Sequence, residues 1–145
     1  KVNKNELANY KVCHPRQIGF VQTTHNEKVF TYAFNNTSED IVVSSVNEVF
    51  STNEDKLYPE YLCMFFNRTE FDRYARFHSW GSARETFTWS DLLEVEIPIP
   101  DIEIQKSIAN VYSVYVKRKE INEQLKAQIK DICPILIRGS LEERK

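Results

Sequence analysis

Two closely spaced prolines, Pro98 and Pro100, stand before a long segment with helical periodicity. A proline removes a backbone donor and disfavours helical geometry in the residue before it, so the pair predicts the end of an extended segment. Asp101 follows and is a residue type that commonly caps a helix N-terminus. We therefore expect a globular part over residues 1–100 and a long helix over residues 101–145.

The expected helix carries an apolar stripe whose members alternate spacings of three and four, as in a coiled coil. The residues predicted to pair with another helix are Ile108, Val111, Tyr115, Asn122, Leu125, Ile129 and Ile132. Arg118 and Asn122 are polar at such positions, and a polar residue there fixes register and partner number at some cost in stability. The sequence offers no second long helix, so we expect the partner helix to come from another polypeptide segment.

The length of this helix follows from its ends. From Asp101 to Cys133, a continuous helix would extend about 50 Å at about 1.5 Å per residue. Pro134 is expected to kink or end it, and Gly139 to end any turn that resumes. A rod of this kind is suited to holding an attached domain at a set distance.

Composition indicates one ordinary domain with an appended helix, because 41% of the 145 residues are hydrophobic and 28% are charged. No apolar run approaches the length of a membrane span and no signal peptide opens the chain, so no membrane partner is expected. Cys13, Cys63 and Cys133 are odd in number and lack C-x-x-C spacing, which favours a reduced, cytoplasmic location and argues against a metal site. Lys1 suggests that the chain begins inside a larger polypeptide or follows a removed segment.

The first hundred residues are expected to form a mixed α+β domain. The predicted strands are 19–22, 29–34, 41–46, 48–50 and 92–97, on the basis of β-branched and aromatic runs between polar turns. Pro59 is well placed to begin a helix, and Thr69 with Asp72 resembles a capping box for a second helix over 70–77. The aromatic residues of this region are expected in the core rather than in a stacking surface; they are Phe65, Phe66, Phe71, Tyr74 and Phe77.

Catalytic chemistry has little support in the sequence. His14, His25 and His78 lack the spacing of metal ligands on a helix, and the adjacent Cys13 and His14 seldom face each other as a nucleophile and base would. No glycine-rich phosphate loop is present. The chain is therefore expected not to be an enzyme.

The ordered set of motifs resembles one half of a type I restriction–modification specificity subunit. The matching pieces are Tyr10 with Gly19-Phe20, Val43-Ser44-Ser45 with Val49-Phe50, Leu57 to Leu62, Gly81-Ser82, Trp89 to Leu92, Ile97 to Pro100, Gln105 and Ile108. The family usually has Glu at the position of Ile104, and the front portion of a recognition domain is missing before Lys1. The chain is thus expected to be a fragment, a processing product or a half-subunit that dimerises.

The resemblance implies a target-recognition domain that binds one half of a split site in double-stranded DNA, followed by a conserved spacer helix. It implies methyltransferase (modification) subunits, a restriction subunit, and a second recognition half or a homodimer as partners. No cofactor is expected on this chain, because S-adenosylmethionine, ATP and Mg belong to the partner subunits in this family. The alternative is a non-enzymatic protein-interaction module that dimerises through its C-terminal helix.

Net charge is −2, which does not by itself indicate nucleic-acid binding. Basic residues are in excess over residues 1–34 and 68–84, whereas residues 35–60 are acidic. Local basic faces are therefore possible, and ordinary mixed-charge surface is the alternative.

Two loops supply the predicted DNA contacts. The first loop holds Ser79, Gly81, Ser82 and Arg84, and the second holds Thr23, Thr24, His25 and Lys28. Hydroxyls, imidazole and basic groups on loops suit contacts to bases and phosphates, and glycine permits a tight turn.

Arg68 and Arg76 are predicted phosphate contacts. The alternatives are that Trp80 is a core residue, that Arg84 pairs with Glu85, that residues 23–28 form a simple hairpin turn, and that the arginines only solvate a helix.

Overall fold

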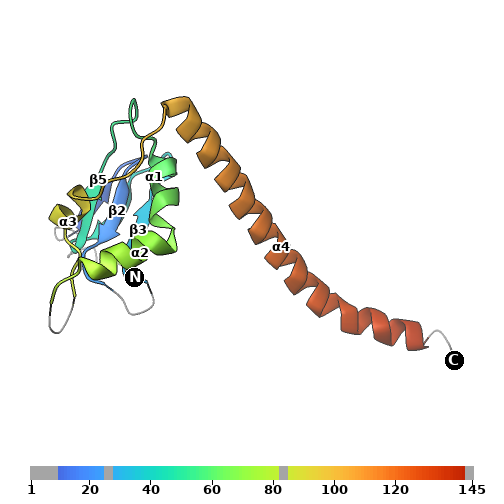
Figure 1. Ribbon diagram of the computed structural model, residues 1–145. Coiled ribbons are helices and arrows are strands. Elements are labelled where there is room, and N and C mark those ends of the chain that lie inside the picture. The colour runs from blue at the N-terminus through green and yellow to red at the C-terminus, as the bar shows by residue number, and fades with distance from the viewer. Residues whose placement is uncertain (1–9, 25–27, 82–84, 143–145) are drawn as a thin grey trace. The chain divides into compact units, whose positions relative to one another are not determined.

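The computed structural model describes residues 10–24, 28–81 and 85–142 of the chain. Within these ranges a run of strands precedes a run of helices (Figure 1). The strands are β1 (Tyr10–Cys13), β2 (Ile18–Val21), β3 (Thr31–Phe34), β4 (Ile41–Ser44) and β5 (Asn47–Phe50). The helices are α1 (Pro59–Phe66), α2 (Thr69–Phe77), α3 (Trp89–Leu93) and α4 (Ile102–Glu142). The predicted mixed α+β class with a long C-terminal helix is confirmed.

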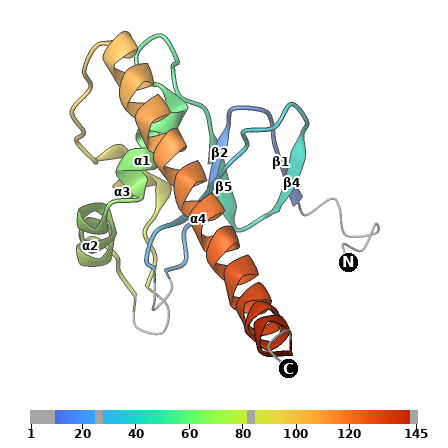
Figure 2. The ribbon, with the colours of Figure 1, turned by 90° about the vertical axis from the view of Figure 1, so that its right-hand side faces the viewer.

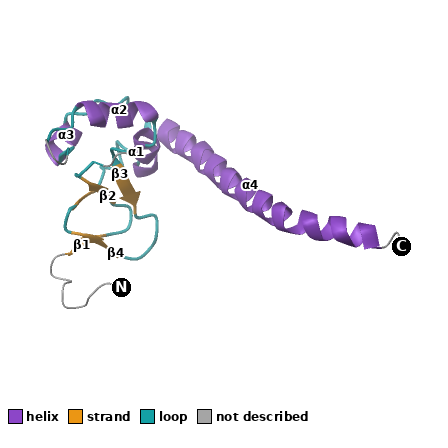
Figure 3. Cartoon of the chain, turned by 90° about the horizontal axis from the view of Figure 1, so that it is seen from below, coloured by secondary structure: helices purple, strands orange, loops and turns teal. Residues whose placement is uncertain are grey.

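The chain separates into two compact units, Lys1–Ser107 and Ile108–Lys145. In the first unit, β2 lies between β3 and β5 in an antiparallel sheet, and β1 pairs with β4 in a second antiparallel sheet. Helices α1, α2 and α3 lie on one side of β2, and the β1–β4 pair lies on the other (Figures 2 and 3). The strands predicted before Pro59 are therefore present, with bounds shifted by a few residues.

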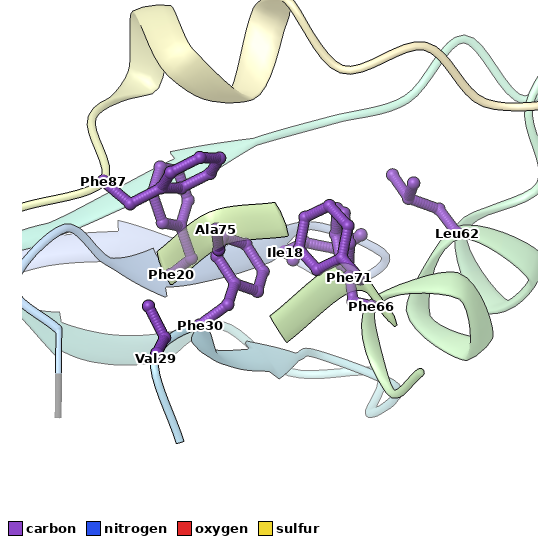
Figure 4. Packing of buried hydrophobic residues seen from close by; sticks show 9 residues of the cluster. All are labelled: Ile18, Phe20, Val29, Phe30, Leu62, Phe66, Phe71, Ala75 and Phe87. Atoms are coloured by element: carbon purple, nitrogen blue, oxygen red, sulfur yellow. The ribbon is translucent and has the colours of Figure 1, made fainter. Parts of the chain in front are cut away.

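The core between the sheet and the helices is mainly aromatic (Figure 4). Phe30 is 1% exposed, and its ring centroid lies 5.2 Å from that of Phe20, 4.8 Å from Phe66 and 5.0 Å from Phe71. Aromatic pairs at such separations add to the stabilisation that burial alone provides. The predicted strand over 29–34 is too long, because β3 begins only at Thr31 and the two residues before it belong to the core-facing loop.

Asp72 explains why that loop stays close to α2. Its Oδ1 accepts the backbone N–H groups of Val29, at 2.9 Å, and Phe30, at 3.1 Å. The predicted capping box of Thr69 with Asp72 is wrong, because α2 starts at Thr69 itself and the cap residue, Arg68, makes no side-chain cap. The carboxylate bonds to a distant segment of the chain instead of to its own helix.

A capping box does occur one helix later, where the sequence predicted a strand. Thr88 Oγ1 accepts the N–H of Asp91 at 3.3 Å, and Asp91 Oδ2 accepts the N–H of Thr88 at 2.7 Å. This reciprocal pair starts α3, so the predicted strand over 92–97 is wrong. Leu92, Val95 and Ile97 still pack on the core, from a short helix and an irregular segment rather than from a strand.

Helix α4 begins directly after Asp101, as expected, and the carbonyl of Asp101 accepts N–H groups from Ile104 and Gln105. The helix continues to Glu142, so the prediction that Pro134 or Gly139 would end it is wrong. A proline removes one backbone donor, and a long helix can continue past it.

Gln105 ties the first turn of α4 to the globular unit. The side chain is 0% exposed. Its Oε1 accepts the N–H of Tyr58 at 2.9 Å, and its Nε2 donates to the carbonyls of Lys56, at 2.8 Å, and Pro100, at 2.7 Å. One amide therefore satisfies three backbone groups that would otherwise lack these partners.

We expect Gln105→Leu to lower the free energy of unfolding by about 2–4 kcal/mol, since buried polar groups left without a partner each cost about 1–3 kcal/mol. Urea unfolding followed by tryptophan fluorescence measures this difference. Gln124→Leu, at an exposed glutamine of the same helix, is the matched control and should change stability little. Equal stability of the two variants would contradict the role assigned to Gln105.

Candidate nucleic-acid interface

The two loops that the sequence singled out separately lie side by side. Thr24 donates to the carbonyl of Glu85 through both its backbone N–H, at 3.0 Å, and its hydroxyl, at 3.1 Å. Phe87 N–H donates to the carbonyl of Gln22 at 2.8 Å, and Thr23 and Thr86 form an antiparallel bridge between these bonds. Residues about sixty positions apart in the chain therefore form one surface.

We call this surface the loop surface and define it by its described residues. They are 22–24, 28, 76–81 and 85–86. His25, Ser82 and Arg84, which were predicted to contact DNA, lie outside the described residues. The alternative pairing of Arg84 with Glu85 lies outside them for the same reason.

The first loop, which holds Ser79 and Gly81, is closed by its own backbone. Trp80 and Thr86 exchange two hydrogen bonds, at 3.1 Å and 2.9 Å. Gly81 follows with φ at 144°, a conformation that side chains with a Cβ rarely adopt. A glycine is therefore favoured at this position, and the residues that follow it, 82–84, lie outside the described ranges.

Ser79 closes the end of α2. Its hydroxyl donates to the carbonyl of Ala75 at 2.6 Å, and its N–H donates to the carbonyl of Arg76 at 3.2 Å. The serine oxygen keeps acceptor capacity. Its predicted contact with DNA stays a prediction.

Three basic side chains around the loop surface are exposed. Arg68 lies 3.5 Å from Glu70, and Arg76 lies 3.9 Å from Glu85. Lys28 donates to Asn67 Oδ1 at 3.4 Å. Exposed ion pairs of this length contribute little to stability, so a phosphate can replace the carboxylate at small cost.

Two aromatic residues of this region are placed differently from the sequence-based expectations. Trp80 is 74% exposed and Phe77 is 80% exposed, so the suggested core position of Trp80 and the predicted core position of Phe77 are both wrong. Phe66 and Phe71 are buried as expected. Phe77 lies at the last residue of α2, where the helix has passed beyond the core.

Arg16 contributes to the basic excess of the first segment, but it has a structural role. Its guanidinium contacts Glu54 at 2.7 Å and binds both carboxylate oxygens of Glu60, at 2.9 Å and 3.0 Å. Hydrogen bonds to these carboxylates raise the pKa of Arg16. Its backbone adopts φ of 67°, which a spacing pattern could not have revealed. Arg16 is therefore not a candidate contact to DNA.

The predicted pairing stripe of α4 is exposed along the described helix. The exposed fractions are 36% for Ile108, 72% for Val111, 59% for Tyr115, 50% for Leu125, 58% for Ile129 and 50% for Ile132. Asn122 is also exposed. An exposed apolar row of this extent is typical of a helix that pairs with another, and the pairing itself stays a prediction.

Two thiols are poorly suited to nucleophilic chemistry. Burial raises the pKa of Cys13, and burial raises the pKa of Cys63 to about 12. Both therefore stay protonated near neutral pH. Among the described residues, no group of three His, Cys, Asp or Glu side chains is arranged to hold a metal ion.

A comparison with known protein families identifies the family of the chain. A family model for the type I restriction modification DNA specificity domain matches residues 2–131, which include the strands, the three short helices and much of α4. The chain belongs to this family. No curated protein matches it.

Membership confirms the resemblance inferred from the ordered motifs, and it gives the chain a DNA specificity function within type I restriction–modification. In this specificity domain, no described helix combines the length and apolar character that a bilayer crossing requires. The sequence pattern indicated both loops, but it did not indicate residues 85–87, which pair with residues 22–24. In the segment from Glu85 to Thr88, polar residues flank the apolar and buried Phe87. This alternation of polar and apolar residues was the available signal for extended backbone in that segment.

We expect Gly81→Ala to lower the free energy of unfolding by about 1–3 kcal/mol, because alanine is strained at this positive φ. Gly19→Ala is the matched control: a Cβ there would lie 3.8 Å from the carbonyl oxygen of Glu48, an ordinary contact, so the loss should stay below about 1 kcal/mol. Denaturant unfolding of both variants measures the difference. A Gly81 variant as stable as the parent would refute the assigned strain.

Proposed function

We propose that this specificity domain binds one half of a bipartite site in duplex DNA through the loop surface, and that α4 pairs with a second helix to place a second recognition half. The observation that carries the proposal is the backbone pairing of residues 22–24 with residues 85–87. It places residues 22–24, which include two predicted DNA contacts, beside a segment that also bonds to Trp80 in the other predicted loop, within a chain of the DNA specificity family.

The loop surface offers the chemistry that base and phosphate recognition needs. Thr23, Thr24 and Thr86 present hydroxyl-bearing side chains that are partly exposed. Hydroxyls can donate to or accept from base edges in the grooves, and they also bind phosphate oxygens. The hydroxyls of Thr24 and Thr86 donate to the carbonyls of Glu85 and Trp80, which orients both side chains, and each hydroxyl oxygen keeps acceptor capacity.

The basic residues support phosphate contacts at two separate places. Arg68 precedes α2 and Arg76 lies in its last turn, so they are about 12 Å apart along the helix axis at about 1.5 Å per residue. That span is comparable to the major groove, which is about 12 Å wide. Lys28 lies near Arg68, since its ammonium contacts the preceding Asn67. Contacts at both ends of α2 would orient the loop surface on the duplex.

The exposed stripe of α4 supports pairing with another helix. Its partner would be the spacer of a second recognition half or the same helix of a second copy. Two antiparallel helices give the twofold relation that a bipartite site requires. The 41 residues of α4 extend about 60 Å at about 1.5 Å per residue, which corresponds to nearly two turns of duplex at about 34 Å per turn.

The chemistry of the system is assigned to other subunits. Methyltransferase subunits would bind S-adenosylmethionine, and a restriction subunit would use ATP and Mg. This chain would supply position rather than catalysis. The competing proposal is a protein-interaction module that dimerises through α4 and has no preference for a DNA sequence.

Mapping methylated genomic sites with and without this gene identifies the target, and a duplex containing the mapped site then serves as the probe. We expect the affinity of the assembled complex for that duplex to fall steeply with salt, because phosphate contacts release counterions. Arg68→Ala and Arg76→Ala should each reduce the salt slope by about one.

Lys106→Ala is the matched control for these arginines, since Lys106 is likewise exposed and paired, with Glu103 at 2.9 Å. It should leave the slope unchanged. No preference for the mapped site over a scrambled duplex would favour the interaction-module alternative and overturn the proposal.

For the helix, we expect Leu125→Glu combined with Ile129→Glu to weaken pairing at least about 100-fold, because a charge at a coiled-coil core position loses its hydration without gaining a partner. Sedimentation equilibrium of the parent and the variant reports the change in assembly mass. Gln128→Glu, at an exposed position between them in the sequence, is the control. A parent that does not pair, or a variant that pairs as tightly as the parent, would contradict the assignment of the stripe.

A further inference from the structure

We infer that Phe77 and Trp80 form an aromatic wedge that inserts at a base step of the bound duplex and bends it. This inference rests on the proposed function and deepens it. The proposed function concerns hydroxyl and basic contacts on the loop surface. The wedge adds an apolar contact that opens the stacked bases.

The side chains of Phe77 and Trp80 are both highly exposed. Phe77 is 80% exposed and Trp80 is 74% exposed, and the two lie three residues apart. Neighbouring aromatic residues of the same region, Phe71 and Phe87, are 4% and 1% exposed. Two exposed large apolar side chains in one short segment indicate an interaction site more than single exposed residues scattered over the surface do.

Hydrogen bonds hold the backbone beneath these two side chains. The N–H groups of His78 and Ser79 donate to the carbonyls of Tyr74, at 3.0 Å, and Arg76, at 3.2 Å. Trp80 is held by its two bonds to Thr86. When the backbone that carries an exposed ring is already ordered, binding through that ring does not cost the free energy of ordering a loop.

The ring of Phe77 is also supported from one side. The imidazole of His78 lies 5.1 Å from the ring of Phe77 and 4.2 Å from the ring of Tyr74, measured between centroids. Tyr74 in turn contacts the buried Phe71, at 6.4 Å. A series of rings therefore connects Phe77 to the core.

The position of both aromatic residues beside the loop surface favours DNA as their binding partner. Trp80 pairs with Thr86, and Thr86 pairs with Thr23, so the tryptophan is continuous with both loops of the loop surface. Arg76 directly precedes Phe77 and is exposed. Proteins that insert apolar wedges between base steps also place Arg, Lys, Asn or Gln side chains in the groove beside them.

The test uses the assembled complex and the duplex that carries the mapped methylation site. The chain has two tryptophans, so Trp89→Phe leaves Trp80 as its sole indole. We expect the fluorescence of Trp80 to be quenched by the duplex, because its ring would stack on bases. A version of the complex with both tryptophans replaced by Phe supplies the background from the partner subunits.

Phe77→Ala and Trp80→Ala should each lower the affinity for the mapped duplex by about tenfold or more, the range seen when a stacking aromatic is removed. They should also reduce the bend of the duplex, measured by energy transfer between its labelled ends. Val42→Ala is the matched control, since Val42 is 54% exposed on β4, on the other sheet. Circular dichroism verifies that each variant is folded.

The outcomes separate the wedge from the proposed function. Alanine variants that retain the affinity and bend of the parent, while the parent still prefers the mapped site, would overturn the wedge alone. A response of Trp80 to the methyltransferase subunit without DNA, and none to the duplex, would identify a protein contact and also overturn it. A parent complex without preference for the mapped site would overturn the proposed function.

Discussion

The carboxylate of Asp72 is the interaction on which the arrangement of the first unit depends most. By accepting two backbone N–H groups just before β3, it fixes the return of one loop against α2. The same two residues, Val29 and Phe30, enter the aromatic core. One carboxylate thus sets both where the core closes and where the loop surface forms, because α2 also leads directly into the first loop, which holds Ser79 and Gly81.

The sequence predicted elements well where the signal was local. Pro59 starts a helix as expected, and Asp101 directly precedes α4. Prediction failed where a distant contact decided the outcome. Asp72 looked like a cap for its own helix but bonds to Val29 and Phe30, and the apolar run after Leu92 looked like a strand although a capping box one turn earlier had begun a helix.

The candidate site shows the same division. Hydroxyls, basic residues and Gly81 indicated two loops, and nothing in their spacing could show that Thr24 bonds to Glu85. Exposure of aromatic residues was not predictable either. Phe71 and Ala75 are four residues apart and share the buried face of α2, whereas Phe77 stands six residues after Phe71, at the end of the helix and away from that face.

Two of the bonds between the segments, from Thr24 N–H to Glu85 and from Phe87 N–H to Gln22, join main-chain atoms, whose chemistry is the same for nearly every amino acid. Substitution of Thr23 would therefore alter a partly exposed side chain without removing the main-chain bonds between the segments. On the proposed function, such a scaffold can acquire a new target in evolution by point changes among the exposed residues of the loop surface. Diversification of specificity then proceeds without the loss of stability that core substitutions impose.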